Sequence, residues 1–369
     1  MSNESIKICH FTSVHARYDT RIYQKQLKCL SKISASVFFV VADGRGDEIT
    51  EAGITIVDAG KPKGRIDRFI TIRKKVFQKA RDIDADIYQF HDPELLKYGL
   101  KLKRKGKKVI YDSHEDVPRQ ILNKPYLKSF TKKIISRWYE KYENRIVKRL
   151  DRIITATDHI TNRFLKFNPN AITVKNYPMV DELKTEINWD KKENKVCYVG
   201  AIDRNRGIKE IKEAIKQTDY RLELAGKFSS QKLQDEILLD SEQAGINFVG
   251  FADRRKVKQI YETSKAGLVT LHPTISYKDA LPVKMFEYML AGIPVIASDI
   301  PLWKSIVEKA DCGITVDPFK PGEIASAIVM LTENNELAEK LGRNGQQAAM
   351  KYYNWKDEEK KLLKIYQEI

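Results

Sequence analysis

Cysteine is scarce in this chain of 369 residues, and its four cysteines lie far apart. Cys9, Cys29, Cys197 and Cys312 form no CxxC pair, and no group of histidines and cysteines has the spacing of zinc ligands. This distribution argues against a disulfide framework and against a metal site. We expect reduced, buried thiols in a cytoplasmic protein with no bound metal.

Long apolar runs are absent as well. No run approaches the roughly 18 residues that a membrane-spanning helix needs, and the first residues, MSNESIKICHF, lack the pattern of a signal peptide. No GxGxxG fingerprint occurs, which argues against a nicotinamide or flavin enzyme. The acids of the sequence Asp84-Ala85-Asp86 flank the start of a predicted strand, the wrong end for ligands of a parallel sheet.

Two series of short apolar runs alternate with helical or turn sequence. The first series is 6–13, 35–43, 54–60, 86–92, 108–115 and 152–158, and the second is 195–202, 221–227, 246–251, 266–272, 294–299 and 312–317. Such runs predict parallel sheets with both faces covered by helices. The length also suits two domains. We therefore expect an α/β protein with two Rossmann-like domains and ligands at the carboxyl ends of the strands.

The most informative segment is 271–299, which is predicted to form a strand, a polar loop, an amphipathic helix and a second strand. Asp279 lies in the loop, Pro282 is expected at the first helical position, and Glu287 lies eight residues after Asp279. The amino end of the helix would then face the loop as an anion site. Two acids beside a bound diphosphate could hold the flanking hydroxyls of a nucleotide sugar. The plainer alternative is an ordinary strand–loop–helix–strand unit.

This segment resembles the retaining GT-B glycosyltransferases, specifically family 4, whose hallmark is an acid, seven residues and a glutamate at a helix start. The resemblance implies that Asp279 contacts the donor sugar and that Glu287 holds the ribose hydroxyls. Two departures occur: the first acid is Asp rather than Glu, and Ala280-Leu281-Pro282 replaces the usual Gly-aromatic-Gly. Some members carry a lysine and a Glu-Tyr pair in the positions of Lys284 and Glu287-Tyr288.

The resemblance implies a GT-B fold, in which two Rossmann-like domains face each other across a cleft. We place the acceptor-binding domain at 1–180 and the nucleotide-sugar domain at 190–350, because 176–194 is polar and aperiodic. Residues 351–369 are expected to form an amphipathic helix that packs back on the first domain.

A second motif lies at 198–211, where a strand ends at Gly200 and a helix starts near Gly207. In the family, arginine and lysine in this loop grip the diphosphate. Arg206 takes the lysine position, Ala201 replaces the usual arginine, and Arg204 or Lys284 could supply the missing charge. A solvated surface position is the alternative for Arg204. The resemblance also implies that loops after the strands contact the donor, through Gly200, Gly226, Gly250, Phe251, Ala280 and Leu281. The alternative for the glycines is that strand ends need them for tight turns.

Polar residues follow three strands of the first domain. His114 is the best match to a family histidine beneath the donor sugar, and satisfying a turn or a sheet edge is its alternative role. Acceptor contacts are expected from residues in the same cleft, namely Arg17, Asp19, Arg21, His91, Asp92 and Glu115.

Positive charge is plentiful, with 66 basic and 50 acidic residues and a net charge of +16. Much of it lies at 101–108 and 127–152, and the latter segment reads as a basic helix. Apolar residues recur there every fourth position, at Ile134, Trp138, Tyr142 and Ile146. Such a helix could lie on an anionic membrane surface, or it could pack its apolar stripe on the domain. No nucleic-acid-recognition pattern occurs, so no nucleic-acid partner is expected.

The resemblance implies a retaining, metal-independent glycosyltransferase with Asp279, His114, Arg206 and Lys284 at the reacting centre. It would move a sugar from a nucleotide-diphosphate donor, with UDP favoured over GDP, to a glycan or lipid-linked acceptor. The setting would be the synthesis of a cell-surface polysaccharide or glycoconjugate, in the cytoplasm or at the inner face of the membrane. No other cofactor is expected. The alternative is a non-catalytic subunit with a degenerate donor site; a nucleotide-sugar epimerase, a phosphorylase and a nucleic-acid-binding protein fit the motifs less well.

Overall fold

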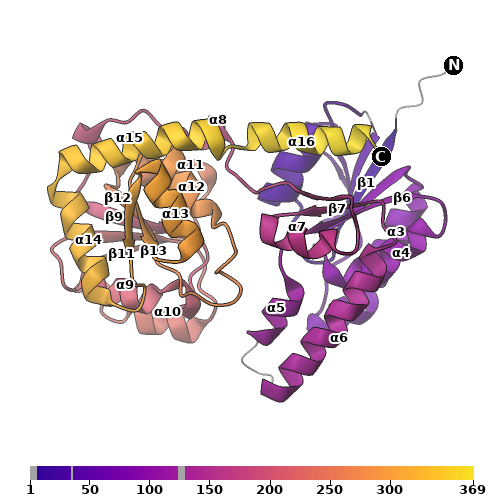
Figure 1. The fold of residues 1–369 in the computed structure, drawn as a ribbon, viewed down its shortest axis with the longest axis horizontal. Helices are drawn as coiled ribbons and strands as arrows, with labels where there is room; N and C mark the ends of the chain where they lie inside the picture. The colour runs from indigo at the N-terminus through magenta and orange to yellow at the C-terminus, as the bar shows by residue number, and fades with distance from the viewer. Residues whose placement is uncertain (1–5, 35, 124–128) are drawn as a thin grey trace. The chain divides into compact units, whose positions relative to one another are not determined.

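A computed structural model of the chain describes residues 6–34, 36–123 and 129–369 (Figure 1). Ala35 of the predicted strand at 35–43, and Leu127 and Lys128 of the predicted basic helix, lie outside these ranges. The chain divides into two compact units. Unit 1 comprises residues 1–176 and 357–369, and unit 2 comprises residues 177–356. The first boundary thus falls at the start of the aperiodic stretch 176–194.

Unit 1 is built on a sheet of eight strands in the order β3-β4-β2-β1-β5-β6-β7-β8. All pairs are parallel except β3 with β4. The predicted runs form six of these strands, and the short strands β3 and β8 were not predicted. The strands are β1 (Lys7–Phe11), β2 (Ser36–Val41), β3 (Glu48–Ile49), β4 (Thr55–Asp58), β5 (Ile87–Phe90), β6 (Lys108–Ser113), β7 (Arg152–Thr155) and β8 (Ala171–Thr173).

Helices cover both faces of this sheet. One apolar core lies between β1, β5, β6 and β7 and the helices α3, α4, α6 and α7. The helical segments are η1 (Thr20–Leu27), α1 (Lys28–Leu30), α2 (Arg65–Asp67), η2 (Arg68–Ile72), α3 (Arg73–Ile83), η3 (Pro93–Leu95), α4 (Leu96–Lys103), α5 (Val117–Leu122), α6 (Ser129–Val147), α7 (Asp158–Leu165) and α16 (Trp355–Gln367). The segments η1 and η2 have the wide turn of a π-helix. The carboxyl-terminal helix α16 belongs to unit 1 from Asp357 onward, with Leu362, Ile365 and Tyr366 buried.

Unit 2 contains six parallel strands in the order β11-β10-β9-β12-β13-β14. The chain enters at β9, builds the sheet outward through β10 and β11, and then crosses to β12. The order therefore reverses between β9 and β12, where the ends of two adjacent strands diverge and leave room for a ligand. The strands are β9 (Lys195–Val199), β10 (Arg221–Ala225), β11 (Ile246–Gly250), β12 (Ala266–Val269), β13 (Val295–Ser298) and β14 (Gly313–Val316).

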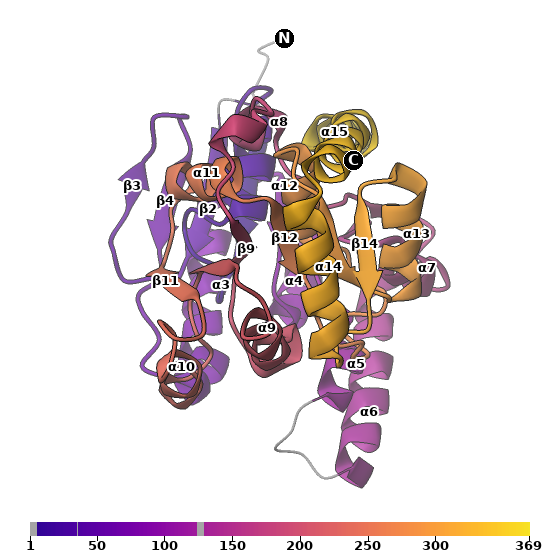
Figure 2. The same ribbon diagram turned by 90° about the vertical axis from the view of Figure 1, so that its left-hand side faces the viewer.

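The helices of unit 2 form two apolar cores, one on each face of the sheet. Helices α9, α10 and α14 contribute to one core, and α11, α12 and α13 to the other. Figure 2 shows the edge strand β14 with α13 on one side and α14 on the other. The helical segments are α8 (Val180–Leu183), η4 (Trp189–Lys191), η5 (Arg204–Arg206), α9 (Ile208–Ile215), α10 (Gln231–Leu238), α11 (Arg254–Thr263), α12 (Val283–Leu290), α13 (Pro301–Ala310), α14 (Pro321–Glu333) and α15 (Asn335–Tyr352).

The basic helix α6 divides into two parts. Ile146, near its end, is buried in the core of unit 1, whereas Phe130, Ile134 and Trp138 are exposed, the last at 66%. Apolar packing therefore explains only the second half of the predicted stripe. Among the described residues, no helix is both long enough and apolar enough to cross a membrane.

Candidate functional site

Helix α12 lies at the point where the strand order of unit 2 reverses. Pro282 is extended and immediately precedes the helix, so the predicted helix start at Pro282 was one residue too early. The helix was predicted to have one exposed face, but it has none, because every residue from Lys284 to Leu290 is buried. The reason is that α15 packs on the side that would otherwise face water.

Lys284 carries the least expected feature of this helix. Its side chain is only 7% exposed, and its ammonium Nζ has no hydrogen-bond partner among the described residues. The ammonium lies 3.4 Å from the centre of the Tyr198 ring, and a Cβ built on Gly200 would come within 3.3 Å of it. Burial, together with the nearby Arg206, holds the pKa of Lys284 well below its ordinary value. A positive charge at the amino end of a helix also opposes the helix dipole.

Two further polar groups come from the loops after β9 and β12, Arg206 and Thr270. Arg206 donates from Nε to Asp203 at 3.0 Å and is half-buried in the turn after β9. The hydroxyl of Thr270, which follows β12, is fully buried without a hydrogen-bond partner among the described residues. Gly207 has a positive φ, and a Cβ there would lie 2.1 Å from the carbonyl oxygen of Thr270. Only glycine therefore lets the arginine turn approach the loop after β12.

Glu287 lies one helical turn after Lys284, and its carboxylate is already held in place. Oε1 accepts from Arg254 Nη1 at 2.9 Å, and Oε2 accepts from the Tyr261 hydroxyl at 3.1 Å. Arg254 also pairs with Glu182 at 3.1 Å. The next residue, Tyr288, accepts a hydrogen bond from the Val199 backbone N–H at 3.0 Å and so ties α12 to β9. These contacts orient the carboxylate before any ligand binds.

The glycines at the strand ends differ in what they permit. Gly200 and Gly226 both have strongly positive φ, and a Cβ on Gly226 would lie 1.8 Å from the carbonyl oxygen of Gly200. These two loops therefore contact each other directly. At Gly250 a Cβ would meet no atom within 4 Å, and the neighbouring Phe251 is 86% exposed. An exposed aromatic ring next to open backbone suits stacking on a planar group.

The loop before α12 is anchored from outside the motif. Trp303, fully buried in α13, donates its indole N–H to the carbonyl oxygen of Ala280 at 2.7 Å. Asp279 is exposed, and Ala280 and Leu281 are half-buried. Arg204, by contrast, is 61% exposed and pairs with Glu236 on α10 at 3.0 Å. Arg204 is therefore a solvent-exposed surface residue, as the alternative interpretation held. Lys284, by contrast, is buried.

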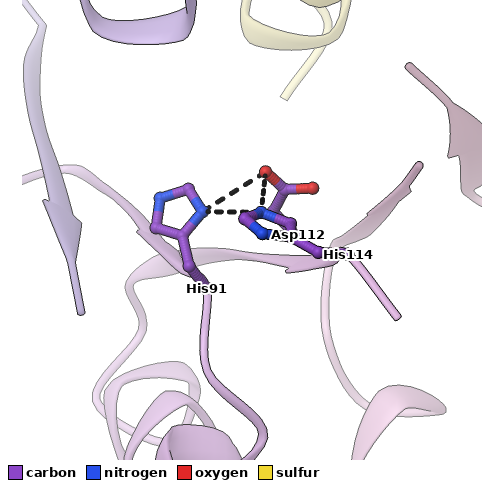
Figure 3. Close-up of side chains that lie close together, drawn as sticks. All are labelled: His91, Asp112 and His114. Carbon is purple, nitrogen blue, oxygen red and sulfur yellow. Dashed lines mark hydrogen bonds and ion pairs between the residues drawn. The ribbon is translucent and has the colours of Figure 1, made fainter. Parts of the chain in front are cut away.

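In unit 1, alternation along the strands brings a second set of polar residues to one face. His10 on β1 is in register with Gln89 on β5, and Asp112 lies near the end of β6 on the same face. His91 and His114 follow β5 and β6. Figure 3 shows both imidazoles directed toward the Asp112 carboxylate. Oδ2 of Asp112 lies 3.2 Å from His91 Nδ1 and 3.0 Å from His114 Nε2.

Two arginines expected to contact the acceptor are instead structural. Arg17 is buried and donates to both Asp43 oxygens, to Glu48 and to the Gly46 carbonyl. Arg21 is buried and donates to Asp112 at 2.7 Å and to the Val174 carbonyl at 2.8 Å. Their N–H groups are committed within unit 1, so a ligand contact does not fit either position.

The remaining predicted acceptor residues have mixed surroundings. Asp19 caps η1 by accepting from two backbone N–H groups, and it also contacts His15 at 3.2 Å. Asp92 is buried and accepts from Ser13 and Thr12, which fastens the loop after β1. Glu115 is exposed and contacts Gln120. Of this set, His91 and Asp92 are gathered around His15 and His114, and Glu115 lies at the rim.

The ligand atoms of His91, Asp112 and His114 lie close enough together to hold a metal ion. However, Asp112 Oδ2 also accepts from Gln26 at 2.7 Å, and Arg21 places a guanidinium on the same carboxylate. The positive charge of Arg21 opposes a second cation at this position.

Comparison with known proteins identifies the family of this chain. Residues 179–348 match the family model for glycosyl transferases group 1, and residues 29–175 match the model for glycosyltransferase family 4. This chain is a family-4-type glycosyltransferase with the GT-B fold. A D-rhamnosyltransferase from Pseudomonas aeruginosa is 22% identical to it over 289 residues, which are 73% of this chain and 71% of the relative.

Solved structures resemble this glycosyltransferase over nearly its whole length. Sucrose-phosphate synthase from Thermosynechococcus elongatus has a TM-score of 0.79 at 16% identity and covers 98% of each chain. HepE from Anabaena, in complex with UDP-glucose, has a TM-score of 0.72 at 14% identity, with 99% of this chain and 100% of the other covered. At these identities the likeness establishes the fold.

Several residues that support these two groups of side chains, one in each unit, were not predicted. Arg254, Tyr261 and Trp303 support the α12 segment, and His15 and Tyr366 join the polar cluster of unit 1. Arg254 lies three residues after Phe251 and begins α11, so a basic residue at a helix start was the available signal. Nothing in the local sequence around Tyr366 indicates its partners.

Proposed function

We propose that this glycosyltransferase transfers a sugar, with retention of anomeric configuration, from a nucleotide-diphosphate sugar to a glycan or lipid-linked acceptor. The observation that carries the proposal is the buried, unpaired ammonium of Lys284 at the amino end of α12. Burying a charge without a hydrogen-bond acceptor is costly, and the contact with the Tyr198 ring offsets that cost only in part, since the pKa of Lys284 is still held well below its ordinary value. A diphosphate bound there would supply the missing negative charge.

The donor site extends from this diphosphate position in two directions. Glu287, oriented by Arg254 and Tyr261, is suited to accept hydrogen bonds from the two ribose hydroxyls. Gly250, whose backbone is open, ends strand β11, and the exposed Phe251 follows it; a base could stack there. We favour UDP as the nucleotide, and the solved HepE complex with UDP-glucose supports this choice by analogy of fold. Asp279, with Ala280 and Leu281, would contact the sugar.

The transfer step needs stabilisation of the departing diphosphate more than it needs a dedicated base. Lys284, Arg206 and the amino end of α12 would stabilise the negative charge that develops as the glycosidic bond to phosphate breaks. The acceptor hydroxyl would attack the same face of the sugar, and a leaving phosphate oxygen would take its proton. These cations take the place of a divalent metal, so we propose metal-independent transfer. His114 would contact a sugar hydroxyl.

The acceptor side belongs to unit 1. Helix α6 presents Phe130, Ile134 and Trp138 to solvent. A nearby hollow of about 350 Å³ is lined mainly by cations, namely Arg119, Arg137, Lys141, Arg163 and Lys166, together with Glu140, Asn144 and Phe167. Apolar side chains beside a cationic hollow suit the surface of an anionic membrane. We propose that the protein acts at the cytoplasmic face of such a membrane in the synthesis of a cell-surface polysaccharide or glycoconjugate.

A thermal-shift screen tests the donor site directly. UDP, GDP, ADP, CMP and their sugar conjugates would be compared on the wild type, Glu287→Ala and a control, Glu308→Ala, whose carboxylate is exposed on α13. We expect one nucleotide diphosphate to raise the unfolding midpoint of the wild type and the control but not of Glu287→Ala. The absence of any shift at millimolar concentrations would refute the donor site. Stabilisation without donor hydrolysis or transfer would instead identify a non-catalytic binding subunit.

A further inference from the structure

The hollow of about 350 Å³ in unit 1 is lined by residues of α5, α6 and the end of α7. Five of these residues are cations: Arg119 from α5, Arg137 and Lys141 from α6, Arg163 from α7, and Lys166, which follows α7. The fold therefore gathers five positive charges from three separate segments around one space, whose volume is within the range of small-molecule sites. We call this space the cationic hollow.

Within the described part of the chain, acids pair with two of these five cations. Arg119 donates from Nη1 to Glu140 at 2.7 Å, and Arg163 Nη1 lies 2.7 Å from the buried carboxylate of Glu143. No acid among the described residues lies within ion-pair distance of the other three cations. Positive charges that are held together without counter-ions repel one another, so the cationic hollow attracts an anion.

Arg163 lies at the buried side of the cationic hollow. Its side chain is only 9% exposed, and none of its three guanidinium nitrogens has a hydrogen-bond partner among the described residues. The contacts with Glu143 at 2.7 Å and with Asp116 at 3.7 Å therefore offset its charge without satisfying its N–H groups. Buried N–H groups without acceptors are costly. The planar guanidinium is suited to donate two of these N–H groups to the oxygens of a phosphate.

Exposed apolar side chains border the cationic hollow on α6. Ile134 and Trp138 are 52% and 66% exposed. Each lies three residues before a cation of the hollow, and residues three apart are neighbours on a helix surface. Phe167, which lines the hollow, is exposed as well. A free phosphate would leave these side chains in water, whereas the acyl chains of a lipid would cover them.

We propose that the cationic hollow binds the terminal phosphate of a membrane lipid, whose acyl chains lie against Ile134, Trp138 and Phe167. A phosphate monoester has three free oxygens and a charge of roughly −1.5 to −2 at pH 7, so cations from three segments can contact it at once. This assignment rests on the membrane surface proposed above and gives that surface a defined site and ligand. General attraction to negative charge would not distinguish one anionic headgroup from another.

Vesicle binding separates a site for a terminal phosphate from attraction to any anionic surface. The full-length protein would be sedimented with phosphatidylcholine vesicles that contain either phosphatidic acid or phosphatidylglycerol, adjusted to equal surface charge. The phosphate of phosphatidylglycerol is a diester with two free oxygens. We expect about tenfold tighter binding to the vesicles with phosphatidic acid, because more charge-assisted hydrogen bonds form there. Equal affinity for the two kinds of vesicle would overturn the proposal.

Two double variants with the same loss of charge locate the site. Arg137→Gln/Lys141→Gln removes two cations of the hollow, whereas Arg104→Gln/Lys105→Gln removes two cations just after α4 that do not line it. All four side chains are exposed, so both variants should fold, and thermal unfolding would verify this. The first variant should lose about tenfold in affinity for vesicles with phosphatidic acid, and the second less than about threefold. The same loss in both variants would contradict a site at the hollow.

Soluble ligands separate a lipid from a free phosphate. Dihexanoyl phosphatidic acid, below its micelle concentration, and inorganic phosphate would each be titrated into the ¹⁵N-labelled protein, with the Arg163 Nε resonance assigned by Arg163→Lys. The lipid should saturate this resonance at about tenfold lower concentration than inorganic phosphate does, because only the lipid covers the apolar side chains. Equal half-saturation would identify free phosphate as the ligand and refute the lipid. A resonance that responds to neither ligand would refute the site.

None of these measurements requires transferase activity. Equal binding to the two kinds of vesicle that is lost in Trp138→Ser would leave the proposed membrane surface in place and overturn the phosphate site. Preference for phosphatidic acid in a protein without transferase activity would instead support the phosphate site and refute the proposed transfer.

Discussion

At the residue scale, Lys284 is a buried cation whose Nζ has no hydrogen-bond acceptor among the described residues. A buried ammonium with no acceptor destabilises the fold until an anion arrives. Lys284→Met should therefore stabilise the ligand-free protein and weaken binding of the nucleotide diphosphate about 10- to 100-fold. Calorimetric titration and thermal unfolding would measure both effects. Lys278→Met, at an exposed lysine in the loop before α12, is the matched control, and equal losses in both variants would contradict the assignment.

The lowered pKa of Lys284 also predicts a pH dependence with a definite sign. Because the folded pKa lies below the unfolded value, the unfolded chain binds more protons, and ligand-free stability should rise as pH increases toward the unfolded pKa. A bound diphosphate raises the folded pKa, so binding should take up a proton between the two values. Titration calorimetry in buffers of different ionisation enthalpy would detect this uptake. Lys284→Met should abolish it, and uptake that persists in that variant would contradict the prediction.

At the scale of elements, the loops after β9 and β10 depend on one close contact. Gly226→Ala would place a Cβ against the Gly200 carbonyl at a φ that side chains rarely adopt. We expect a loss of at least ~3 kcal/mol of stability together with loss of nucleotide binding. Gly250→Ala, with a positive φ but open space around it, should cost only about 1 kcal/mol. Denaturant unfolding would compare the two, and equal costs would show that the contact is unimportant.

Helix α6 allows its two halves to be tested separately. Ile146→Ala should cost ~2–4 kcal/mol because it leaves a cavity in the core of unit 1. Ile134→Ser and Trp138→Ser should change stability little but reduce binding to vesicles that contain anionic lipid. Sedimentation with anionic and with zwitterionic vesicles would measure this loss. Binding that is unaffected by both exposed substitutions would remove α6 from the proposed membrane surface.

At the scale of the whole molecule, the last residues of the chain complete the first unit. Leu362, Ile365 and Tyr366 of α16 are buried there. Truncation after Lys356 should therefore destabilise unit 1 by several kcal/mol, on the order of 5, and leave unit 2 folded. Differential scanning calorimetry with and without the nucleotide diphosphate would separate the units, since the ligand should stabilise unit 2 in both proteins. Loss of that stabilisation on truncation would contradict this division.

A site residue could be predicted from the sequence when its partners are close to it along the chain, and not when they are far away. Asp279, Glu287 and Lys284 could be predicted as one group because a strand, a loop and a helix that follow one another in sequence position them; their roles remain predictions. Arg17 and Arg21 could not be assigned correctly, because their carboxylate partners lie 26 and 91 residues away. A local pattern shows that an arginine is present but not which acid it will meet.

The sequence by itself determined the two α/β sheets, the segment from the end of β12 through α12, and the family to which these belong. It could do so because strand and helix periods, and motifs within about thirty residues, are set by local physics. The tertiary structure decided that Arg17 and Arg21 pair with carboxylates inside unit 1, and that Lys284 Nζ has no hydrogen-bond partner among the described residues. It also joined Tyr366 to His10 across 356 residues. Strand order and helix docking make those pairings, and no local pattern encodes them.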